Sequence, residues 1–496
     1  MGEALSLTKI DAARQRAVAE ALRAFLPAHA VLWQEEDTRP YECDGLTAYR
    51  HVPMVVALPE TEAQVQRVLQ TCHALAVPVV PRGAGTGLSG GALPRGDGVL
   101  LSLAKFMRVV RIDPLARIAV VQPGVRNAAI SDVVSAFGLY YAPDPSSQIA
   151  CSIGGNVAEN SGGVHCLKYG LTVHNVLKVR GFTVDGEPVA FGSEALDAPG
   201  YDLLALAIGS EGMLAVTTEV TVKLLPKPQA AQVVMASFDD VETAGHAVAA
   251  IIAAGILPAG LEMMDKPATR AVEEFVHAGY DLEAAAILLC ECDGTPEEVQ
   301  DEIARVREVL ARAGATATSV SRDEPERLRF WSGRKAAFPA VGRISPDYYC
   351  MDGTIPRKRL GEVLNFIGEM ELKYGLRCPN VFHAGDGNLH PLILFDAASA
   401  DELKRTEQFA AEVLEKCVAV GGTITGEHGV GVEKIDQMCV QFTPAELETF
   451  HALKRAFDPK GLLNPGKAVP TLRRCAEFGR MHVRGGQLPH PELPRF

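Results

Sequence analysis

Two short stretches in the second half of the chain gather side chains that core packing does not require. The first carries His383 and His390 around a glycine turn, and the second carries Glu427 and His428 between two glycines. Two imidazoles and one carboxylate are the ligand set of a catalytic divalent-metal site, which keeps positions open for a substrate. A single histidine is more often a hydrogen-bonded structural residue, so the prediction of metal ligands His383, His390 and Glu427 rests on the set.

His428 directly follows a predicted metal ligand, and it is the candidate general base. An imidazole titrates near neutral pH, and a nearby cation favours its neutral, proton-accepting form. A hydroxyl group bound to a metal ion loses its proton more readily than a free one. These residues therefore predict that His428 removes a proton from a substrate hydroxyl.

A glycine-rich stretch in the first half of the chain has the composition of an anion-binding loop. Glycine lacks the Cβ atom that blocks close approach, and it allows turns that point successive backbone N–H groups at a phosphate. The predicted phosphate-binding residues are Pro81, Arg82, Gly83, Ala84, Gly85, Thr86, Gly87, Leu88, Ser89 and Gly90.

This loop matches neither of two common nucleotide-binding motifs. Gly85, Gly87 and Gly90 have the spacing of the Rossmann fingerprint, but residues 91–98 hold the Pro and Gly that stop the required helix. No Gly-Lys-Ser/Thr follows, as a P-loop needs. On this motif alone, a glycine-rich surface connection is the alternative interpretation. Further stretches rich in Gly, Ser and Asn at 142–163 and 208–212 indicate walls around a long ligand.

Composition narrows the class of protein. The 496 residues suggest about three structural units, and a net charge of −13 disfavours a nucleic-acid partner. We expect a cytoplasmic protein without a transmembrane segment, because the start lacks signal-peptide features and no long apolar run follows. Eleven scattered cysteines without a CxxC pair argue against an iron–sulfur cluster and suit free thiols.

Strands and helices must position these groups. An apolar strand at 54–58, a helix opened by the capping box Thr61-Glu62-Ala63-Gln64 and a strand at 77–80 predict a β-α-β unit before the glycine loop. After Pro226-Lys227-Pro228, an alternating pattern predicts a sheet covered by helices on one face. Its strands are expected at 233–238, 261–264 and 285–292, and its helices at 241–253 and from Thr295 onward.

Four motifs in this order resemble the FAD-binding domain of the vanillyl-alcohol-oxidase type. They are Pro-Arg-Gly-Ala-Gly-Thr-Gly-Leu-Ser-Gly-Gly at 81–91, Pro-Asp-Pro-Ser-Ser at 143–147, Gly-Gly-Asn-Val-Ala-Glu-Asn-Ser-Gly-Gly at 154–163 and Gly-Ser-Glu-Gly at 209–212. Within that group the chain is most similar to the FAD-linked D-2-hydroxy-acid dehydrogenases, in particular to the D-subunit family of bacterial glycolate oxidase. The resemblance covers roughly residues 50–468.

The resemblance implies an α+β fold with three parts. An FAD-binding domain of the PCMH type consists of two α+β subdomains, an α+β ferredoxin-like substrate domain caps the flavin, and a C-terminal helical segment returns to it. The expected division is an N-terminal helical segment at 1–50, the FAD-binding domain at 51–228, the substrate domain at 229–420, the C-terminal segment with metal and base residues at 421–470, and an extended tail at 471–496.

The same resemblance implies how FAD is held. The first loop binds the pyrophosphate, and the later motifs line the isoalloxazine and adenosine portions. Because residues 81–91 contain neither His nor Cys, we expect non-covalent FAD. A turn-forming role is the alternative for Asn464. The further implied FAD-binding residues are Pro143, Asp144, Ser147, Gly154, Gly155, Asn156, Asn160, Gly163, Glu211, Gly212 and Asn464.

A carboxylate on the substrate calls for a cationic partner. Trp331-Ser332-Gly333-Arg334-Lys335 resembles the Trp-x-x-Arg-Lys element of the family, which implies that Arg334 clamps the carboxylate with Lys335 beside it. A solvated helix face is the alternative for Arg334. Where relatives that oxidise a five-carbon diacid carry Lys and Asn, this chain has Cys350 and Leu392, which favours a short acid.

The resemblance implies an FAD- and metal-dependent oxidoreductase that converts glycolate or D-lactate to the 2-oxo acid by hydride transfer to flavin N5. Zinc is the expected metal because it is redox-inert beside a flavin, with manganese, iron or cobalt as alternatives. The alternative functions are a stand-alone D-lactate or D-2-hydroxyglutarate dehydrogenase, a non-catalytic flavoprotein subunit of an electron-transfer complex, and a metal-only iron oxygenase.

The resemblance also implies partners. Since the chain lacks cluster ligands and a membrane span, we expect it to pass electrons to an iron–sulfur subunit, in a complex with a second flavin-fold subunit. Such a complex would lie in the cytoplasm or at the inner face of the membrane.

Overall fold

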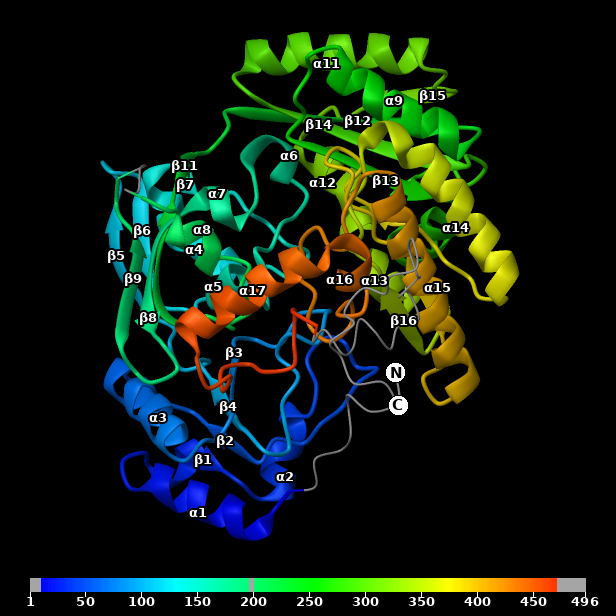
Figure 1. Cartoon of the computed structure of the whole chain (residues 1–496). Coiled ribbons are helices and arrows are strands. Elements are labelled where there is room, and N and C mark those ends of the chain that lie inside the picture. Colours follow the sequence, from blue (N-terminus) through cyan, green and yellow to red (C-terminus); the bar gives the residue numbers. More distant parts are fainter. Residues whose placement is uncertain (1–9, 196–199, 471–496) are drawn as a thin grey trace.

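The computed structural model describes residues 10–195 and 200–470, and the expected tail at 471–496 lies outside the described residues. Figure 1 shows two α+β bodies that carry β1–β10 at the lower left and a third body, with β12–β15, at the upper right. Helix α17 runs across the front between them. None of the helices in the described residues combines the length and apolar character needed to cross a bilayer.

The first body contains the predicted β-α-β unit. Its parallel strands β2, β4 and β3 receive β1 as an antiparallel edge strand, so residues before position 51 contribute to this sheet. The capping box of α3 forms as predicted, with Thr61 and Gln64 bonded reciprocally. The elements are α1 (Ala12–Arg23), β1 (Val31–Leu32), α2 (Glu35–Thr38), β2 (Val55–Ala57), α3 (Glu62–Ala74), β3 (Val79–Arg82) and β4 (Val99–Ser102).

The second body is an antiparallel sheet in the order β5-β6-β10-β8-β9, with short helices packed on it. Together the two bodies give the two α+β subdomains that the family resemblance implied. The elements are β5 (Val109–Asp113), β6 (Ile118–Val121), α4 (Asn127–Val134), β7 (Leu139–Tyr140), α5 (Ile153–Glu159), α6 (Cys166–Tyr169), α7 (Thr172–Asn175), β8 (Val176–Phe182), β9 (Pro188–Gly192), α8 (Leu203–Ala207), β10 (Val216–Lys223) and β11 (Leu225–Pro226).

The third body, here called the cap, has the antiparallel order β15-β12-β14-β13-β17. Helix α9 joins β12 to β13 and α11 joins β14 to β15, which is the ferredoxin-like arrangement that was expected. The elements are β12 (Ala230–Phe238), α9 (Val241–Ala253), β13 (Gly260–Asp265), α10 (Lys266–Val276), β14 (Ala286–Gly294), α11 (Pro296–Arg312), β15 (Ala317–Val320), α12 (Glu324–Lys335), α13 (Ala337–Val341) and β17 (Val381–Phe382).

The prediction that helices cover one face of the cap sheet is wrong, because both faces are covered. Val234 and Leu288 pack in the apolar cluster that includes α9 and α11. Their strand neighbours Val233 and Leu289 point the other way and pack with residues of α10 and α12. Strands with both faces buried read as continuous apolar runs, and that pattern does not show how many helix layers are present.

The C-terminal part returns to the first body. Asn464 donates its backbone N–H to Val79 O at 2.7 Å, which places the chain end beside β3. The stretch with Glu427 follows helix α15, and an isolated bridge between Thr354 and Thr423 lies at its start. The elements are β16 (Asp347–Cys350), α14 (Leu360–Tyr374), β18 (Leu392–Phe395), α15 (Ala400–Ala419), α16 (Met438–Gln441) and α17 (Pro444–Phe457).

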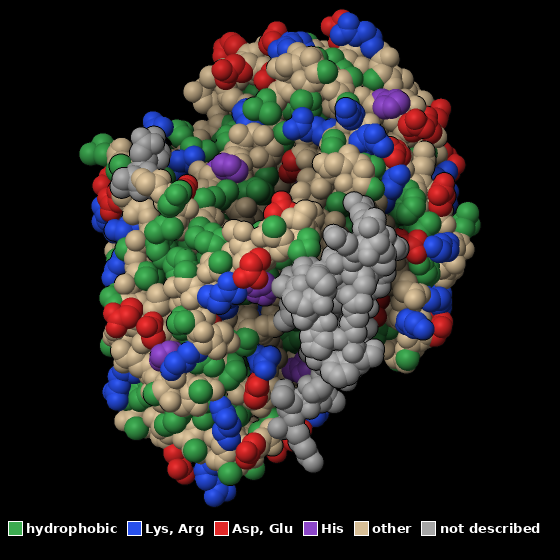
Figure 2. Space-filling view, viewed as in Figure 1, with side chains coloured by type: hydrophobic (Ala, Val, Ile, Leu, Met, Phe, Trp, Pro, Cys, Tyr) green, Lys and Arg blue, Asp and Glu red, His purple; other side chains and the backbone are tan. Residues whose placement is uncertain are grey.

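The distribution of surface charge and the state of the cysteines can be compared with the expectations from the sequence. Figure 2 shows acidic and basic side chains interspersed over the visible face rather than gathered in one basic patch. Nine cysteines within residues 10–195 and 200–470 are free thiols, and Cys290 and Cys292 share one face of β14 as predicted. Cys439 is disulfide-bonded, so the expectation of free thiols throughout is wrong there, because sequence spacing gave no sign of pairing.

Candidate active site

A cavity of about 400 Å³ lies where the first and second bodies, here called the FAD-type subdomains, meet the cap. One end is lined by the glycine loop and α5, and the other by side chains of the cap and of the stretch with Glu427. The predicted site residues that line it are Pro81, Arg82, Gly83, Ala84, Gly85, Thr86, Gly87, Leu88, Ser147, Gly154, Gly155, Asn156, Glu211, Gly212, Lys335, His390, Glu427 and His428. The cavity thus brings the two halves of the predicted site together.

The glycine loop leaves β3 without starting a helix anywhere between Arg82 and β4, so it is not a Rossmann loop. Ser152 Oγ accepts a hydrogen bond from Ala84 N at 3.2 Å and joins this loop to the N-terminus of α5. A Cβ atom at position 83 would lie 2.3 Å from that hydroxyl oxygen, which explains Gly83. Gly85 has a φ of +73°, a conformation that side chains rarely adopt.

The three predicted metal ligands converge at one point. Glu427 Oε1 lies 3.2 Å from His383 Nε2 and 3.2 Å from His390 Nε2. Yet His390 Nε2 has no hydrogen-bond partner among the described residues, so it faces the carboxylate without the alignment of a hydrogen bond. His383 Nε2 is hydrogen-bonded to the same carboxylate oxygen. Two imidazole nitrogens close to one buried carboxylate oxygen are the donor set expected around a shared cation.

Electrostatics at these atoms also favours positive charge. Burial lowers the pKa of His383, but the carboxylates of Glu262 and Glu427 outweigh it and raise the pKa well above its ordinary value. Burial raises the pKa of Glu427, but the two histidines reverse this effect and hold it well below the usual range. The chemistry of the residues therefore fits a divalent cation, and the metal stays a prediction.

Asp352 holds the loop that carries the predicted base. Its side chain accepts hydrogen bonds from the backbone N–H groups of Gly426, Glu427 and His428, the last at 2.9 Å. Burial is the main cause that lowers the pKa of His428 to about 4, which keeps the imidazole neutral at physiological pH. A neutral imidazole beside the ligand set can accept a proton.

Arg334 has a different partner from the expected one. Its Nε donates to Glu262 Oε2 at 2.6 Å, and the guanidinium is only 1% exposed. The side chain does not line the cavity, whereas its neighbour Lys335 does. The guanidinium of Arg334 thus forms a buried ion pair with Glu262. It neither points into the cavity nor lies on a solvated helix face.

Asn464 has hydrogen-bond partners within the protein. Its Nδ2 donates to Gly91 O and Glu211 O, and its Oδ1 accepts from Lys467 Nζ at 2.7 Å. With these partners, the side chain ties loops together behind the cavity, and both of its N–H groups are used within the protein. Its φ of +45° agrees with the turn-forming alternative. The other predicted residues outside the lining are Ser89, Gly90, Pro143, Asp144, Asn160, Gly163 and His383.

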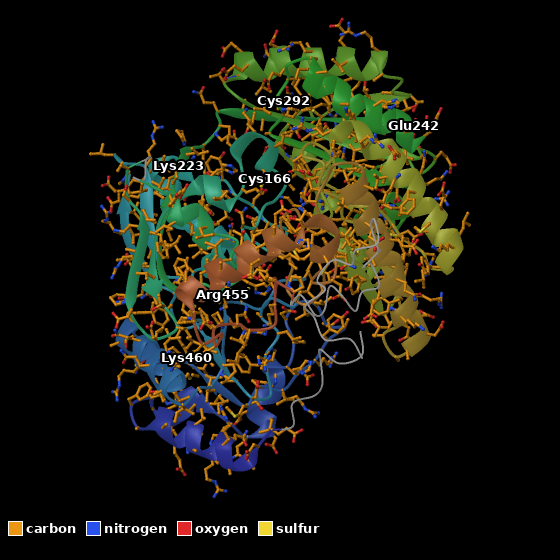
Figure 3. The ribbon with its side chains drawn as sticks, in the orientation of Figure 1. Cys166, Lys223, Glu242, Cys292, Arg455 and Lys460 are labelled. Carbon is orange, nitrogen blue, oxygen red and sulfur yellow. The ribbon has the colours of Figure 1, made fainter. Side chains whose placement is uncertain are left out.

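Asp144 instead belongs to a charged network between the FAD-type body and the cap. It accepts from His165 Nδ1 at 2.7 Å, while His165 Nε2 lies 3.2 Å from Glu291 Oε1 on β14. Glu291 also pairs with Arg327 at 2.7 Å. Figure 3 shows Cys166, the next residue on α6, below the cap strand that carries Cys292. The network therefore fixes the wall of the cavity to the cap.

Among the lining residues that sequence reasoning missed, Glu159, Phe338 and Tyr348 have a charged or an aromatic side chain. Glu159 ends α5, and Phe338 and Tyr348 form an aromatic pair with ring centroids 5.6 Å apart. Glu159 lies within the predicted FAD-binding motif at 154–163. A charged residue among Gly and Asn was a signal in the sequence that could have identified it as a site residue. The two aromatic residues lie on different elements, and no sequence spacing links them.

Cys350 and Leu392 are cross-strand partners between β16 and β18, and both are buried. They do not line the cavity. These are the two positions where relatives that oxidise a five-carbon diacid carry Lys and Asn. They therefore lie together behind the cavity wall.

The fold and cavity define a flavoprotein of a known class. Residues 53–192 match the family described as FAD binding domain, and residues 227–468 match the C-terminal domain of FAD linked oxidases. The chain belongs to the FAD-linked oxidases of the glycolate oxidase GlcD and D-lactate dehydrogenase family, and it is an FAD-dependent oxidoreductase.

Relatives in sequence place the chain within that class. The glycolate oxidase subunit GlcD of Escherichia coli strain K12 is 64% identical over 476 residues, which cover 96% of this chain and 95% of the relative. GlcD of Bacillus subtilis is 37% identical, with 86% and 91% covered. A D-lactate dehydrogenase of Anaerostipes hadrus is 31% identical, with 88% and 94% covered.

Solved structures support the fold alone. A p-cresol methylhydroxylase matches with a TM-score of 0.78 at 18% identity, and covers 94% of this chain and 98% of that one. A 4-ethylphenol oxidase from Gulosibacter chungangensis gives the same TM-score of 0.78 at 17% identity, with 94% and 99% covered. The predicted vanillyl-alcohol-oxidase-type architecture is confirmed.

Proposed function

We propose that this chain oxidises a short 2-hydroxy acid, glycolate or D-lactate, to the 2-oxo acid with FAD and a divalent metal ion, preferably zinc. The observation that carries the proposal is the convergence of His383, His390 and Glu427, with His428 beside them, at the cap end of an FAD-type cavity. The names of its relatives, glycolate oxidase subunit and D-lactate dehydrogenase, support the same substrates.

When bound, FAD supplies the hydride acceptor at N5, and the metal supplies Lewis acidity for the hydroxyl oxygen. His383, His390 and Glu427 would hold the metal, and the glycine loop would hold the pyrophosphate through its backbone N–H groups. Non-covalent attachment is consistent with the absence of His and Cys from residues 81–91.

Each remaining side chain at the cap end has a separate task. Lys335 lines the cavity and is the cation that binds the substrate carboxylate. The neutral imidazole of His428 accepts the hydroxyl proton as the Cα hydrogen leaves as hydride. Arg334 acts through Glu262 on His383, although it remains adjacent to Lys335.

The cavity favours a small substrate. Phe338 and Tyr348 form an apolar wall at the cap end, and Cys350 and Leu392 place no charged group behind that wall. A short acid therefore fits better than D-2-hydroxyglutarate, since a second carboxylate buried without a partner is costly.

The enzyme is proposed to pass its electrons to partner chains. Within the described residues, the two groups placed to hold a metal consist of His, Asp and Glu and contain no cysteine. An iron–sulfur subunit is thus the proposed acceptor, in a complex with a second flavin-fold subunit. The GlcD relatives are named as subunits, which supports the proposal of a complex. This complex would work in the cytoplasm or at the inner face of the membrane.

An anaerobic titration tests the function. The purified holoprotein is mixed with glycolate, D-lactate, L-lactate or D-2-hydroxyglutarate, before and after chelation by EDTA, and the visible flavin band is followed. Glycolate or D-lactate should bleach the band, chelation should abolish bleaching, and added zinc should restore it. Bleaching only by D-2-hydroxyglutarate would reject the short substrate, and bleaching that survives complete metal removal would reject the role of the metal.

A further inference from the structure

Glu159 is an acidic side chain of the cavity wall that the proposed reaction does not use. It ends α5 and lines the cavity, and its Oε2 is buried without a hydrogen-bond partner in the described part of the chain. A Cβ atom at Gly91 would lie 2.5 Å from its Oε1, and one at Gly429 would lie 2.1 Å from its Oε2. The carboxyl group thus lies between the glycine loop and the loop of His428.

The neighbouring carboxylate Glu211 shows what Glu159 lacks. Glu211 accepts hydrogen bonds from Val430 N and Gly431 N, each at 2.7 Å, which stabilise a negative charge. No residue that the structure describes donates such a bond to Glu159 Oε2. Burial and the negative charges of Glu211 and Asp44 raise the pKa of Glu159 well above its ordinary value.

The nearby cations do not compensate, because their hydrogen bonds go elsewhere. Lys434 Nζ donates to Gly429 O at 2.9 Å and to Glu433 at 2.7 Å. Lys467 Nζ donates to Gly91 O at 2.9 Å and to Asn464 Oδ1 at 2.7 Å. An ionised Glu159 would therefore be a buried charge without a bonded counter-charge, facing a cavity built for an anionic dinucleotide.

We propose that Glu159 is a neutral carboxylic acid in the folded enzyme and that its O–H group donates a hydrogen bond to an acceptor atom of bound FAD. In this form the residue does not repel the cofactor, and its unpaired oxygen gains a partner when the cavity fills. The inference rests on the FAD part of the proposed function and is independent of the substrate and the metal.

Titration of the apoprotein with FAD tests this inference. Three variants are compared with the wild-type chain: Glu159→Gln keeps a neutral donor of the same shape, Glu159→Met keeps the length without a donor, and Glu187→Met makes the same change at an exposed site. Since a neutral hydrogen bond contributes about 1 kcal/mol, Glu159→Met should raise the FAD dissociation constant about fivefold. Glu159→Gln and Glu187→Met should stay within about twofold of wild type.

The melting temperature of each apoprotein shows whether the variants fold. An FAD affinity of Glu159→Gln as weak as that of Glu159→Met would overturn the inference, because a negative charge would then be required. Wild-type affinity in Glu159→Met would also overturn it, because no hydrogen bond would then be lost. Failure of the wild-type chain itself to bind FAD is a different result, which would reject the proposed cofactor.

Discussion

Glu262 Oε1 lies 2.7 Å from His383 Nδ1, while Oε2 of the same buried carboxylate accepts from Arg334 Nε. This relationship sets the orientation of a predicted metal ligand. With Nδ1 facing Glu262, His383 directs Nε2 toward Glu427. A carboxylate behind a ligating imidazole fixes its tautomer and raises its basicity.

Replacing Glu262 with Gln should therefore weaken metal binding by about 10- to 100-fold. Competition between the apoprotein and a chelator of known zinc affinity measures the change. Because Arg334 loses its buried counter-charge, the melting temperature should fall as well. A folded variant with wild-type zinc affinity would show that Glu262 does not support the metal site.

Replacing His428 with Gln should lower kcat for the hydroxy acid by at least about 100-fold, because the general base is lost. FAD and metal contents should stay near those of the wild-type protein, since His428 holds neither in this scheme. Stopped-flow reduction of the flavin and metal analysis measure the two properties. Reduction at the wild-type rate would remove His428 from the reaction.

Replacing Lys335 with Met should raise KM for glycolate by about 10-fold or more, because the substrate carboxylate loses a charged hydrogen bond. Lys335→Arg keeps the charge and should recover part of the affinity. Steady-state kinetics with both variants separate KM from kcat. Equal KM values in the wild type and Lys335→Met would assign carboxylate binding to another group.

Tyr348 lines the cavity beside Phe338, and we expect its ring to limit the length of the substrate at the cap end. Tyr348→Ala should raise the kcat/KM of D-2-hydroxybutyrate relative to that of D-lactate about 10-fold, as expected for room for one methylene. Phe366→Ala is a matched aromatic control, because Phe366 packs away from the cavity on α14. An unchanged ratio in Tyr348→Ala would place the limit elsewhere.

Glu291 should make the contact between α6 and the cap sensitive to acid. Although burial raises its pKa, His165, Arg327 and Trp331 outweigh it and lower the pKa from 4.5 to about 2. The folded-state pKa lies below the unfolded one, so the stabilisation is present above about pH 4.5 and is lost as pH falls toward 2. The shift corresponds to a free energy on the order of 3 kcal/mol.

The variant Glu291→Gln tests this dependence. Its melting temperature should lie below that of the wild type at pH 7. The difference should shrink as pH falls from about 5 toward 2, because Glu291 of the unfolded wild-type chain takes up a proton in this range while the folded carboxylate stays ionised. A difference that stays constant over this range would mean that Glu291 does not titrate with folding.

Local patterns predicted several elements well. The capping box at Thr61, the helix start at Thr295 and the apolar runs of the cap strands depend on residues close in sequence, and the structure contains them. The number of helix layers on the cap sheet was predicted wrongly, because a strand buried on both faces gives the same apolar run whatever covers it.

Residue types and their order therefore determined the class of this protein: the glycine loop, the His and Glu stretches and the family resemblance all follow from the sequence. Only the tertiary structure decided which groups face the cavity. Arg334 and Asn464 have side chains able to bind a ligand, but Glu262, Gly91 and Glu211 take their hydrogen bonds. Partners that lie far apart in the chain compete for each donor, and the packing of the domains decides which of them is within reach.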